Sequence, residues 1–371
     1  MTRKAIATVL LASALVSAAQ AAERQEPAAQ IRVPKIQVAI LLDNSGSMGG
    51  LINQAKAQLW KFINEFATTR KEGKIPEIEV ALYIYGVSPT QILPLTNDLD
   101  LVSEKLFAVP VDGGHEFCGQ VIQMAVKDLK WSGSNQDLKV IFIAGNEPFT
   151  QGPVNYAEAC KAAIARGIIV NTIHCGSDAQ GVGGKWKDGA LLADGSYMCI
   201  NQNTKVPHIV APQDKEIARL SAGLNDTYLP YGAAGAAGQE RQSAQDANAA
   251  GVALEVAVQR AVAKANAQYR NDRWDLVDAV ANGTLKIEDL KEDQLPEKMQ
   301  KMSAEERKAF VEANRAQRAH IQKQINDLNA QRNKYVAEEM KKLAEKGEDT
   351  LDAAMIKTLR AQAERKEFKT N

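Results

Sequence analysis

The sequence has none of the features that mark a nucleic-acid-binding or membrane-spanning protein. Its 371 residues include 45 acidic and 45 basic side chains, so the formal net charge is zero. Nucleic-acid-binding domains normally have a basic face or a high isoelectric point, so this balance argues against a nucleic-acid partner. After residue 21, no apolar run approaches the roughly 20 residues that a membrane helix needs. We therefore expect no membrane span in the mature chain.

Motifs of common enzyme classes are also missing. The chain has no glycine-led phosphate loop, no G-x-S-x-G nucleophile elbow and no pair of carboxylates at helical spacing for acid–base work. The sequence therefore favours a binding protein without catalytic activity over an enzyme.

Cysteine is scarce, with four residues in the chain: Cys118, Cys160, Cys175 and Cys199. In an oxidising compartment an even number permits disulfides, and four cysteines allow three pairings, among which the sequence does not choose. A chain of this length does not need cross-links to fold, so a bridge would fix a loop, for example between Cys175 and Cys199.

Two histidines lie beside cysteines, at His115 with Cys118 and at His174 with Cys175. Both pairs fall at the same edge of the expected sheet, and His and Cys are the usual zinc ligands. Their spacing matches no zinc motif, so a disulfide or plain packing is the better interpretation, and a Cys–His catalytic dyad meets the same objection.

The first 21 residues have the pattern of a cleavable secretory signal. Arg3 and Lys4 precede an apolar stretch at 5–18, and Ala19-Gln20-Ala21 is a small-x-small cleavage site. Residues 22–35 then form a short polar leader, and no cysteine follows the apolar stretch to take a lipid anchor. We expect a periplasmic or otherwise exported protein, with an uncleaved N-terminal anchor as the alternative.

Residues 36–232 alternate between strand and helix patterns, which predicts a doubly wound, mostly parallel α/β sheet of Rossmann-like type. The predicted strands are 36–43, 77–87, 91–95, 138–144, 167–175 and 227–231. The predicted helices are 48–70, 99–109, 119–131, 155–166 and 212–224. A Gly-rich, polar insert at 176–211 interrupts the pattern; its Trp186 and Tyr197 either pack it onto the domain or offer a recognition surface.

The last third of the chain has a different character. The glycine-rich stretch at 233–238 predicts a linker, and residues 239–371 have the composition of an all-α region. Ser303 with Glu306 forms a capping box that opens a long helix. A coiled-coil seam follows at spacings of four and three: Ile321, Ile325, Leu328, Arg332 and Tyr335. This seam fits either an intramolecular helical hairpin or self-association through the tail.

The strongest functional signal is the loop Asp43-Asn44-Ser45-Gly46-Ser47, between the first predicted strand and the first long helix. Asp43, Ser45 and Ser47 alternate along it, which places three hard oxygen ligands on one side of a tight turn. Oxygen ligands of this kind suit Mg²⁺, with Mn²⁺ or Ca²⁺ as alternatives. Without a metal, the same side chains would be expected to cap the helix that follows.

This loop, in its strand–loop–helix setting, resembles the D-x-S-x-S motif of the von Willebrand factor type A (VWA) family, and the resemblance extends over residues 36–232. It implies a metal-ion-dependent adhesion site, at which a divalent cation contacts a partner protein, often through the partner's carboxylate. Asp43, Ser45 and Ser47 then correspond to metal ligands.

Two family ligand positions differ in this chain. The position of a second-loop Thr falls on Glu116, and that of a third-loop Asp falls on Gly145, with Asn146 and Glu147 next to it as substitutes. Together, Asp43 and Glu116 would neutralise a divalent cation, so such a site would attract a partner's carboxylate less strongly. The expected metal set is Asp43, Ser45, Ser47 and Glu116.

Two functions remain open at this point. The first is an exported, metal-dependent protein-binding module. The alternative is a structural or assembly protein of the cell envelope whose VWA-like domain no longer binds metal, which the loss of the third-loop Asp favours.

Overall fold

The computed structural model describes residues 32–66, 69–86, 88–114, 116–201, 203, 208–343 and 351–370. The predicted signal peptide, nearly all of the predicted leader and His115 lie outside these residues. Residues from Val33 onward group into one unit. Within the described ranges, no helix combines the length and the apolar character that crossing a bilayer requires.

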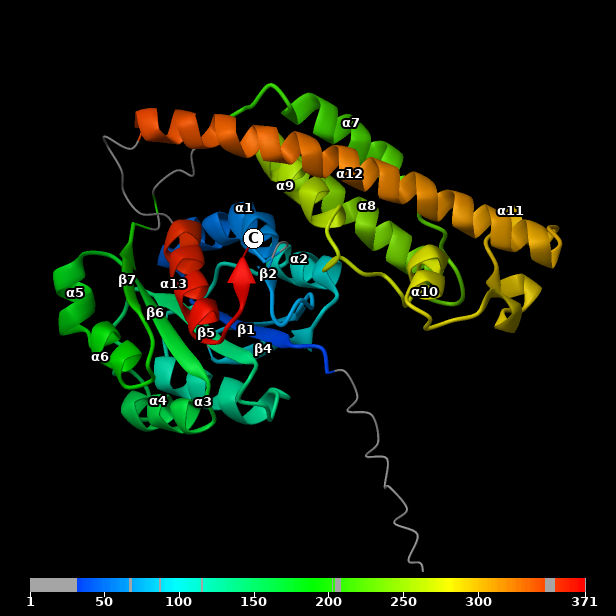
Figure 1. Ribbon diagram of the computed structural model, residues 1–371. Coiled ribbons are helices and arrows are strands. Elements are labelled where there is room, and N and C mark those ends of the chain that lie inside the picture. The colour runs from blue at the N-terminus through cyan, green and yellow to red at the C-terminus, as the bar shows by residue number, and fades with distance from the viewer. Residues whose placement is uncertain are drawn as a thin grey trace, which may run out of the picture. The chain divides into compact units, whose positions relative to one another are not determined.

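A six-stranded sheet forms the centre of this unit (Figure 1). Its strands, in chain order, are β1 (Lys35–Leu42), β3 (Glu77–Ile84), β4 (Thr90–Thr96), β5 (Leu138–Gly145), β6 (Ile169–Cys175) and β7 (Tyr197–Ile200). They lie in the order β4-β3-β1-β5-β6-β7, and all neighbours are parallel except β3 and β4. The predicted doubly wound, mostly parallel sheet is confirmed.

Helices and short elements surround the sheet and extend beyond it. The helices are α1 (Gly49–Asn64), α2 (Leu99–Phe107), α3 (Cys118–Asp128), α4 (Tyr156–Ala165), α5 (Asp178–Gly183), α6 (Trp186–Leu191), α7 (Asp214–Asn225), α8 (Gly235–Val252), α9 (Leu254–Lys264), α10 (Leu276–Ala281), α11 (Glu297–Gln300), α12 (Ala304–Leu343) and α13 (Leu351–Arg365). Three 3-10 turns, η1 (Gly46–Met48), η2 (Ile287–Asp289) and η3 (Glu292–Gln294), and a small sheet of β2 (Thr69–Arg70) with β8 (Lys369–Thr370) complete the fold.

Alternate residues of each central strand enter two different cores, because successive side chains of a strand point to opposite faces. Val38 and Leu42 of β1 pack with α1 and α2 on one face, whereas Ala39 and Leu41 pack with α3 and α4 on the other. Covering both faces explains the almost continuous apolar run of this strand. It also places the carboxyl end of β1 between those of β3 and β5, where the loops that follow these strands meet.

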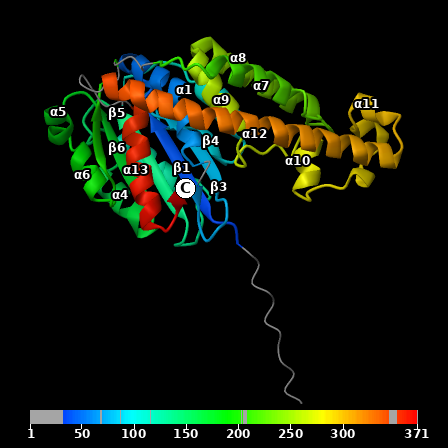
Figure 2. The same cartoon turned by 45° about the horizontal axis from the view of Figure 1, so that its top comes forward.

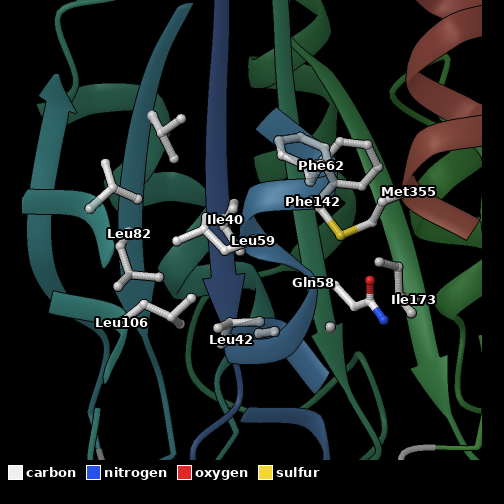
Figure 3. A pocket seen from close by; sticks show the side chains of 14 residues that line it. Ile40, Leu42, Gln58, Leu59, Phe62, Leu82, Leu106, Phe142, Ile173 and Met355 are labelled. Atoms are coloured by element: carbon white, nitrogen blue, oxygen red, sulfur yellow. The ribbon is translucent and has the colours of Figure 1, made fainter. Parts of the chain in front are cut away.

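The face packed by α1 and α2 leaves a small apolar cavity of about 40 Å³. Figure 3 shows Ile40 and Phe142 of the sheet opposite Leu59 of α1, with Met355 of α13 closing one side. The C-terminal helix α13 therefore packs directly against the central sheet, although the two lie far apart in the sequence.

The predicted insert at 176–211 contributes to the core instead of interrupting it. It contains α5, α6 and the edge strand β7, which pairs in parallel with β6. Trp186 is fully buried, so the packing interpretation holds for this side chain. The predicted strand at 227–231 is wrong: those residues form only an isolated bridge from Pro230 to Asp275. The apolar pattern at 227–231 has another cause: Tyr228 and Leu229 pack into cores formed with helices.

The predicted linker at 233–238 falls largely on the first turn of α8, which begins at Gly235. Gly235 and Gly238 are buried. A Cβ on Gly235 would lie 2.9 Å from the Pro230 carbonyl carbon, and one on Gly238 would lie 2.2 Å from Trp274. These glycines therefore permit close packing of α8. The glycine-rich composition of 233–238, which predicted a flexible linker, reflects this close packing.

The helical region packs back onto the sheet domain. α9 and α13 contact α1, α8 contacts α2, and β8 pairs with β2. Buried charges reinforce this contact: Arg260 of α9 pairs with Asp100 of α2 and stacks 4.4 Å from the ring of Trp60 in α1. The predicted boundary between the two regions stays a prediction, but their contacts join them into one unit.

The predicted coiled-coil seam packs within the chain, because α12 contacts α7 and α9. Ile321 and Ile325 are buried in the main core. Arg332 is also buried, and its Nε donates to Asp214 of α7 at 2.7 Å, which offsets the cost of burying its charge. The capping box is also present, with Ser303 N 2.7 Å from Glu306 Oε2 and Glu306 N 3.3 Å from Ser303 Oγ. The seam therefore fits the intramolecular alternative; self-association stays a prediction.

We predict opposite effects of alanine at two glycines of α8. Gly238→Ala forces a methyl group into the ring of Trp274 and should lower the free energy of unfolding by about 1–3 kcal/mol. Gly251→Ala meets no atom within 4 Å and should raise it by about 0.5–1 kcal/mol. Urea denaturation of both variants measures this, and a neutral Gly238→Ala would mean that 233–238 is a flexible linker after all.

Candidate metal site

The Asp43–Ser47 loop forms a tight turn directly after β1. Asp43 N donates to Ala144 O at 2.9 Å, which holds the start of the loop against β5. Ser45 N donates to Asp43 Oδ1 at 2.7 Å, and the hydroxyl oxygens of Ser45 and Ser47 lie 3.3 Å apart. The three predicted side chains are therefore brought together.

Helix capping does not account for this arrangement. η1 and α1 follow the loop, and neither has a side-chain hydrogen bond at its N-cap. The Asp43 carboxylate instead accepts from Ser45 N within the turn, which leaves Asp43 Oδ2 buried and without a hydrogen-bond partner. Burying a carboxylate oxygen without a hydrogen-bond partner costs free energy. Capping of the following helix therefore does not explain the conformation of this loop.

Glu116 joins the loop from the segment before α3. The side chain is 2 % exposed, and its Oε1 accepts from Ser45 Oγ at 3.1 Å. Its Oε2 accepts from Glu147 N at 3.1 Å, and its carboxyl group lies close enough to that of Asp43 to raise the pKa of Glu116. The residue at the family's Thr position thus bridges all three loops at this edge of the sheet.

The third loop follows β5 and brings Asn146 and Glu147 to the same place. Asn146 Nδ2 donates to Ser47 Oγ at 3.3 Å, which leaves Asn146 Oδ1 buried and without a hydrogen-bond partner. Gln151 Nε2 donates to Glu147 Oε2 at 3.1 Å. Asn146 therefore offers a free oxygen to the site, whereas the Glu147 side chain is engaged beside it.

The structure explains why glycine occupies the family's third-loop Asp position. A Cβ on Gly145 would lie 2.5 Å from the Tyr85 hydroxyl, 3.1 Å from Asp43 Cβ and 3.2 Å from the Trp186 ring. Tyr85 donates to Ala144 O at 2.7 Å, and Trp186 Nε1 donates to Glu147 O at 2.9 Å. Two aromatic side chains have taken the space of the carboxylate and support the loop. This role could not be predicted from the sequence, because Tyr85 and Trp186 both lie far from the D-x-S-x-S loop in the chain.

Burial and like charge act together on the two carboxyl groups. Burial, the hydrogen bond to Asp43 and the charge of Asp43 raise the pKa of Glu116 to about 8. Burial likewise raises the pKa of Asp43. Two carboxyl groups in contact cannot both ionise without a compensating cation, so the pair holds a proton near neutral pH.

The donor set fits a hard divalent cation. Two carboxyl groups, two hydroxyls and the Asn146 amide oxygen converge, and two of these oxygens lack a hydrogen-bond partner. Ser47 and Gly46 are exposed, so the cluster opens to solvent. Among the described residues, no three or more His, Cys, Asp or Glu side chains are grouped so that they alone could hold a metal ion. Any ion here would therefore depend on hydroxyl and amide oxygens as well as the two carboxylates.

All four cysteines are free, which corrects the disulfide expectation. The register partner of Cys199 on β6 is His174, so Cys175 points to the opposite face of the sheet from Cys199. Burial raises the pKa of the Cys118 and Cys160 thiols, which makes them poor nucleophiles and poor metal ligands. For the same geometric reason, adjacent His174 and Cys175 cannot act on one ion.

We predict that Glu116 makes the metal-free protein less stable as the pH rises. Its folded pKa of about 8 exceeds the value of 4.5 expected for an unfolded chain. Between these values the unfolded state loses a proton that the folded state keeps, so the free energy of unfolding falls with pH. Glu116→Gln removes this titration, so its stability relative to wild type should increase by at least about 1.4 kcal/mol from pH 5 to pH 9.

Urea denaturation in EDTA checks this pH dependence. Glu158→Gln, at an exposed position on α4, is the matched control and should follow wild type at every pH. A constant difference between Glu116→Gln and wild type across the range would show that the two carboxyl groups do not interact.

Comparison with known proteins matches part of this chain to one family. Residues 37–182 match the family model of the von Willebrand factor type A domain. No curated protein matches the sequence. The expected resemblance to this family is therefore confirmed for residues 37–182.

Several solved structures are similar to part of the chain. BatB from Bacteroides thetaiotaomicron is 17% identical over 45% of this chain and 90% of its own, with a TM-score of 0.36. The SpRpn10 VWA domain is 22% identical over 48% and 100%, with a TM-score of 0.37. Proximal thread matrix protein 1 from the mussel byssus, with a zinc-occupied MIDAS motif, is 11% identical over 46% and 43%, with a TM-score of 0.36.

Domains of this family generally serve protein–protein interaction or adhesion and are not generally enzymes. The match therefore places residues 37–182, which include the Asp43–Ser47 loop, in a class of interaction modules. Residues 37–182 of this chain belong to the von Willebrand factor type A domain family.

Proposed function

We propose that this chain is an exported, non-catalytic binding protein that holds a divalent cation at Asp43, Ser45, Ser47 and Glu116. The observation that carries the proposal is the contact of two buried carboxyl groups with one residue: Ser45 donates its N–H to Asp43 and its hydroxyl to Glu116. This contact lies among hydroxyl and amide oxygens at the solvent-facing edge of the sheet. A cation there removes the repulsion between the carboxylates and satisfies the orphaned oxygens.

The chemistry of the ligands favours Mg²⁺, with Mn²⁺ or Ca²⁺ as alternatives. All the candidate donors are hard oxygens, and burial raises the pKa of the nearby Cys118 and Cys175 thiols, which makes them poor ligands. The Asn146 oxygen completes the set, and Glu147 contributes from outside by orienting Glu116 through its backbone N–H. Two anionic ligands match the charge of one divalent cation.

The rim of this site supplies the proposed contact surface for a partner protein. Gly46 and Ser47 are exposed on one side, and Gly113 and Gly114 are exposed in the loop before Glu116. Val111 is 46% exposed in the same loop, which gives the rim an apolar contact beside the polar site. A small, partly apolar patch with a polar centre is the usual anatomy of a protein interface.

The proposed location is the periplasm or the exterior of the cell. It rests on the charged start, apolar stretch and small-x-small site of residues 1–21. A partner would then belong to the cell envelope.

One observation favours the alternative of a structural protein without metal. Tyr85 and Trp186 fill the place of the third-loop carboxylate, so the site has lost one family ligand. A proton shared between Asp43 and Glu116 would stabilise the pair without any ion. In that case the domain would act in assembly of the envelope.

We predict that the mature wild-type chain binds one Mg²⁺ or Mn²⁺ ion and that Asp43→Ala does not. Glu116→Gln should weaken binding at least about tenfold, or 1.4 kcal/mol, because it removes one of two anionic ligands. Binding should tighten by about tenfold from pH 6 to pH 7, because each ion displaces a proton from a pair with a pKa of about 8.

Isothermal titration calorimetry measures the affinity and the proton release. Asp112→Ala is the matched control, because Asp112 is an exposed carboxylate in the neighbouring loop and should leave the affinity unchanged. Equal ion binding by wild type and Asp43→Ala would rule out this site.

We predict that partner capture from an envelope extract depends on both the ion and Asp43. Wild type should retain its partner in Mg²⁺ and release it in EDTA, and Asp43→Ala should retain none. Sedimentation of the full mature chain distinguishes the alternative, in which the chain assembles into multimers equally in Mg²⁺ and in EDTA. The full chain is required because α9 and α13 pack on α1, so removing the helical region would expose the core.

A further inference from the structure

The charges around the metal edge restrict the kind of partner that could bind there. This inference rests on the proposed function, because it takes that edge as the contact surface. Three loops meet at the edge: 43–48, 109–117 and 145–155. Together they contain four carboxylates and neither lysine nor arginine: Asp43, Asp112, Glu116 and Glu147. The loops that form the proposed contact surface are therefore acidic.

Hydrogen bonds hold the three loops against one another. Asp112 N donates to Asn44 O at 2.7 Å, which joins the second loop to the first. Glu147 N donates to Glu116 Oε2 at 3.1 Å, which joins the third loop to the second. Burial and, to a smaller extent, the charge of Glu147 raise the pKa of Asp43. The four carboxylates therefore belong to one surface and act on each other.

The chain itself does not neutralise these carboxylates. Among the described residues, no lysine, arginine or histidine forms a salt bridge with any of the four. The neighbouring segment 178–191 has two acidic and two basic residues, so it adds no compensating charge. Helix N-termini near the edge contribute only partial positive charges, which salt screens and which fade within the first turn.

A bound divalent cation would offset only half of this charge. It would balance Asp43 and Glu116 and would leave Asp112 and Glu147 uncompensated. Asp112 is exposed and Glu147 is half-buried, so a partner can reach both. Glu147 Oε2 already accepts from Gln151 Nε2 at 3.1 Å, but a carboxylate accepts several hydrogen bonds, so this contact leaves room for another donor.

We propose that the partner presents a basic side chain, arginine or lysine, to this edge, where sites of the VWA family often take a carboxylate. A carboxylate from a partner would meet like charge at Asp112 and Glu147, and the charge of the ion would already be balanced by its own ligands. An arginine or lysine would instead pair with the two uncompensated carboxylates. The edge therefore selects a basic surface on the partner.

Three small probes that differ in charge test this preference: methylguanidinium, acetamide and acetate. The full mature chain is mixed with a smaller amount of Mn²⁺, which speeds the relaxation of nearby protons, and NMR measures the relaxation rate of each probe's methyl protons. In wild type, we expect the enhancement to be at least about threefold larger for methylguanidinium than for acetate, with acetamide between them. The combined variant Asp112→Asn with Glu147→Gln should lower this ratio to about one or less.

Glu240→Gln with Glu305→Gln serves as the control, because it removes two exposed carboxylates from the helical region and should keep the wild-type ratio. Asp112→Asn alone should give part of the change, which keeps the test decisive if the combined variant does not fold. Circular dichroism checks the fold of every variant, and electron paramagnetic resonance checks that each binds Mn²⁺ as wild type does.

Two results would overturn the proposal while leaving the metal site intact. One is an enhancement for acetate that equals or exceeds that for methylguanidinium in wild type. The other is an unchanged ratio in the folded Asp112 variants. A different result would refute the proposed function and this inference with it: wild type that leaves the resonance signal of free Mn²⁺ undiminished.

Discussion

The contact between the carboxyl groups of Asp43 and Glu116 is the constraint on which the account of this protein depends. Two buried acids that lie close together repel each other when both are ionised, and burial raises the cost of this repulsion because it removes the screening by water. A proton or a cation must therefore offset the negative charge of the pair. The raised pKa of Glu116 reflects this, because the side chain keeps its proton to a higher pH. The neighbouring hydroxyls of Ser45 and Ser47 are the reason for proposing a cation at this pair.

The fold holds this contact in place through elements that lie far from it in sequence. Asp43 is bonded to the end of β5, and Glu116 is bonded to the loop after β5. Tyr85 and Trp186 fill the space behind that loop. Helices α9 and α13 pack against α1 (Figure 2). The C-terminal helices are thus part of the structure that supports the site.

Much of the fold could be predicted from the sequence because the pattern of a parallel strand is local. The run at 36–43 and the helical spacing after it located β1, α1 and the loop between them. The position of Glu116 also followed from the sequence, through the family motif.

The roles of Tyr85 and Trp186 could not be predicted, because they depend on which residues meet across the sheet. The glycines at 235 and 238 misled for a similar reason: composition does not distinguish a flexible linker from a close helix contact, which is decided here by Pro230 and Trp274. Likewise, β7 was missed because a short edge strand of four residues carries too little pattern.

The most direct test of the central claim is a crystal structure of the full mature chain grown with Mn²⁺, with anomalous diffraction used to locate the ion. The account predicts one manganese peak at about 2.0–2.6 Å from oxygens of both Asp43 and Glu116, with a hydroxyl of Ser45 or Ser47 in its coordination shell. An empty site between Asp43 and Glu116 at saturating Mn²⁺ would contradict it.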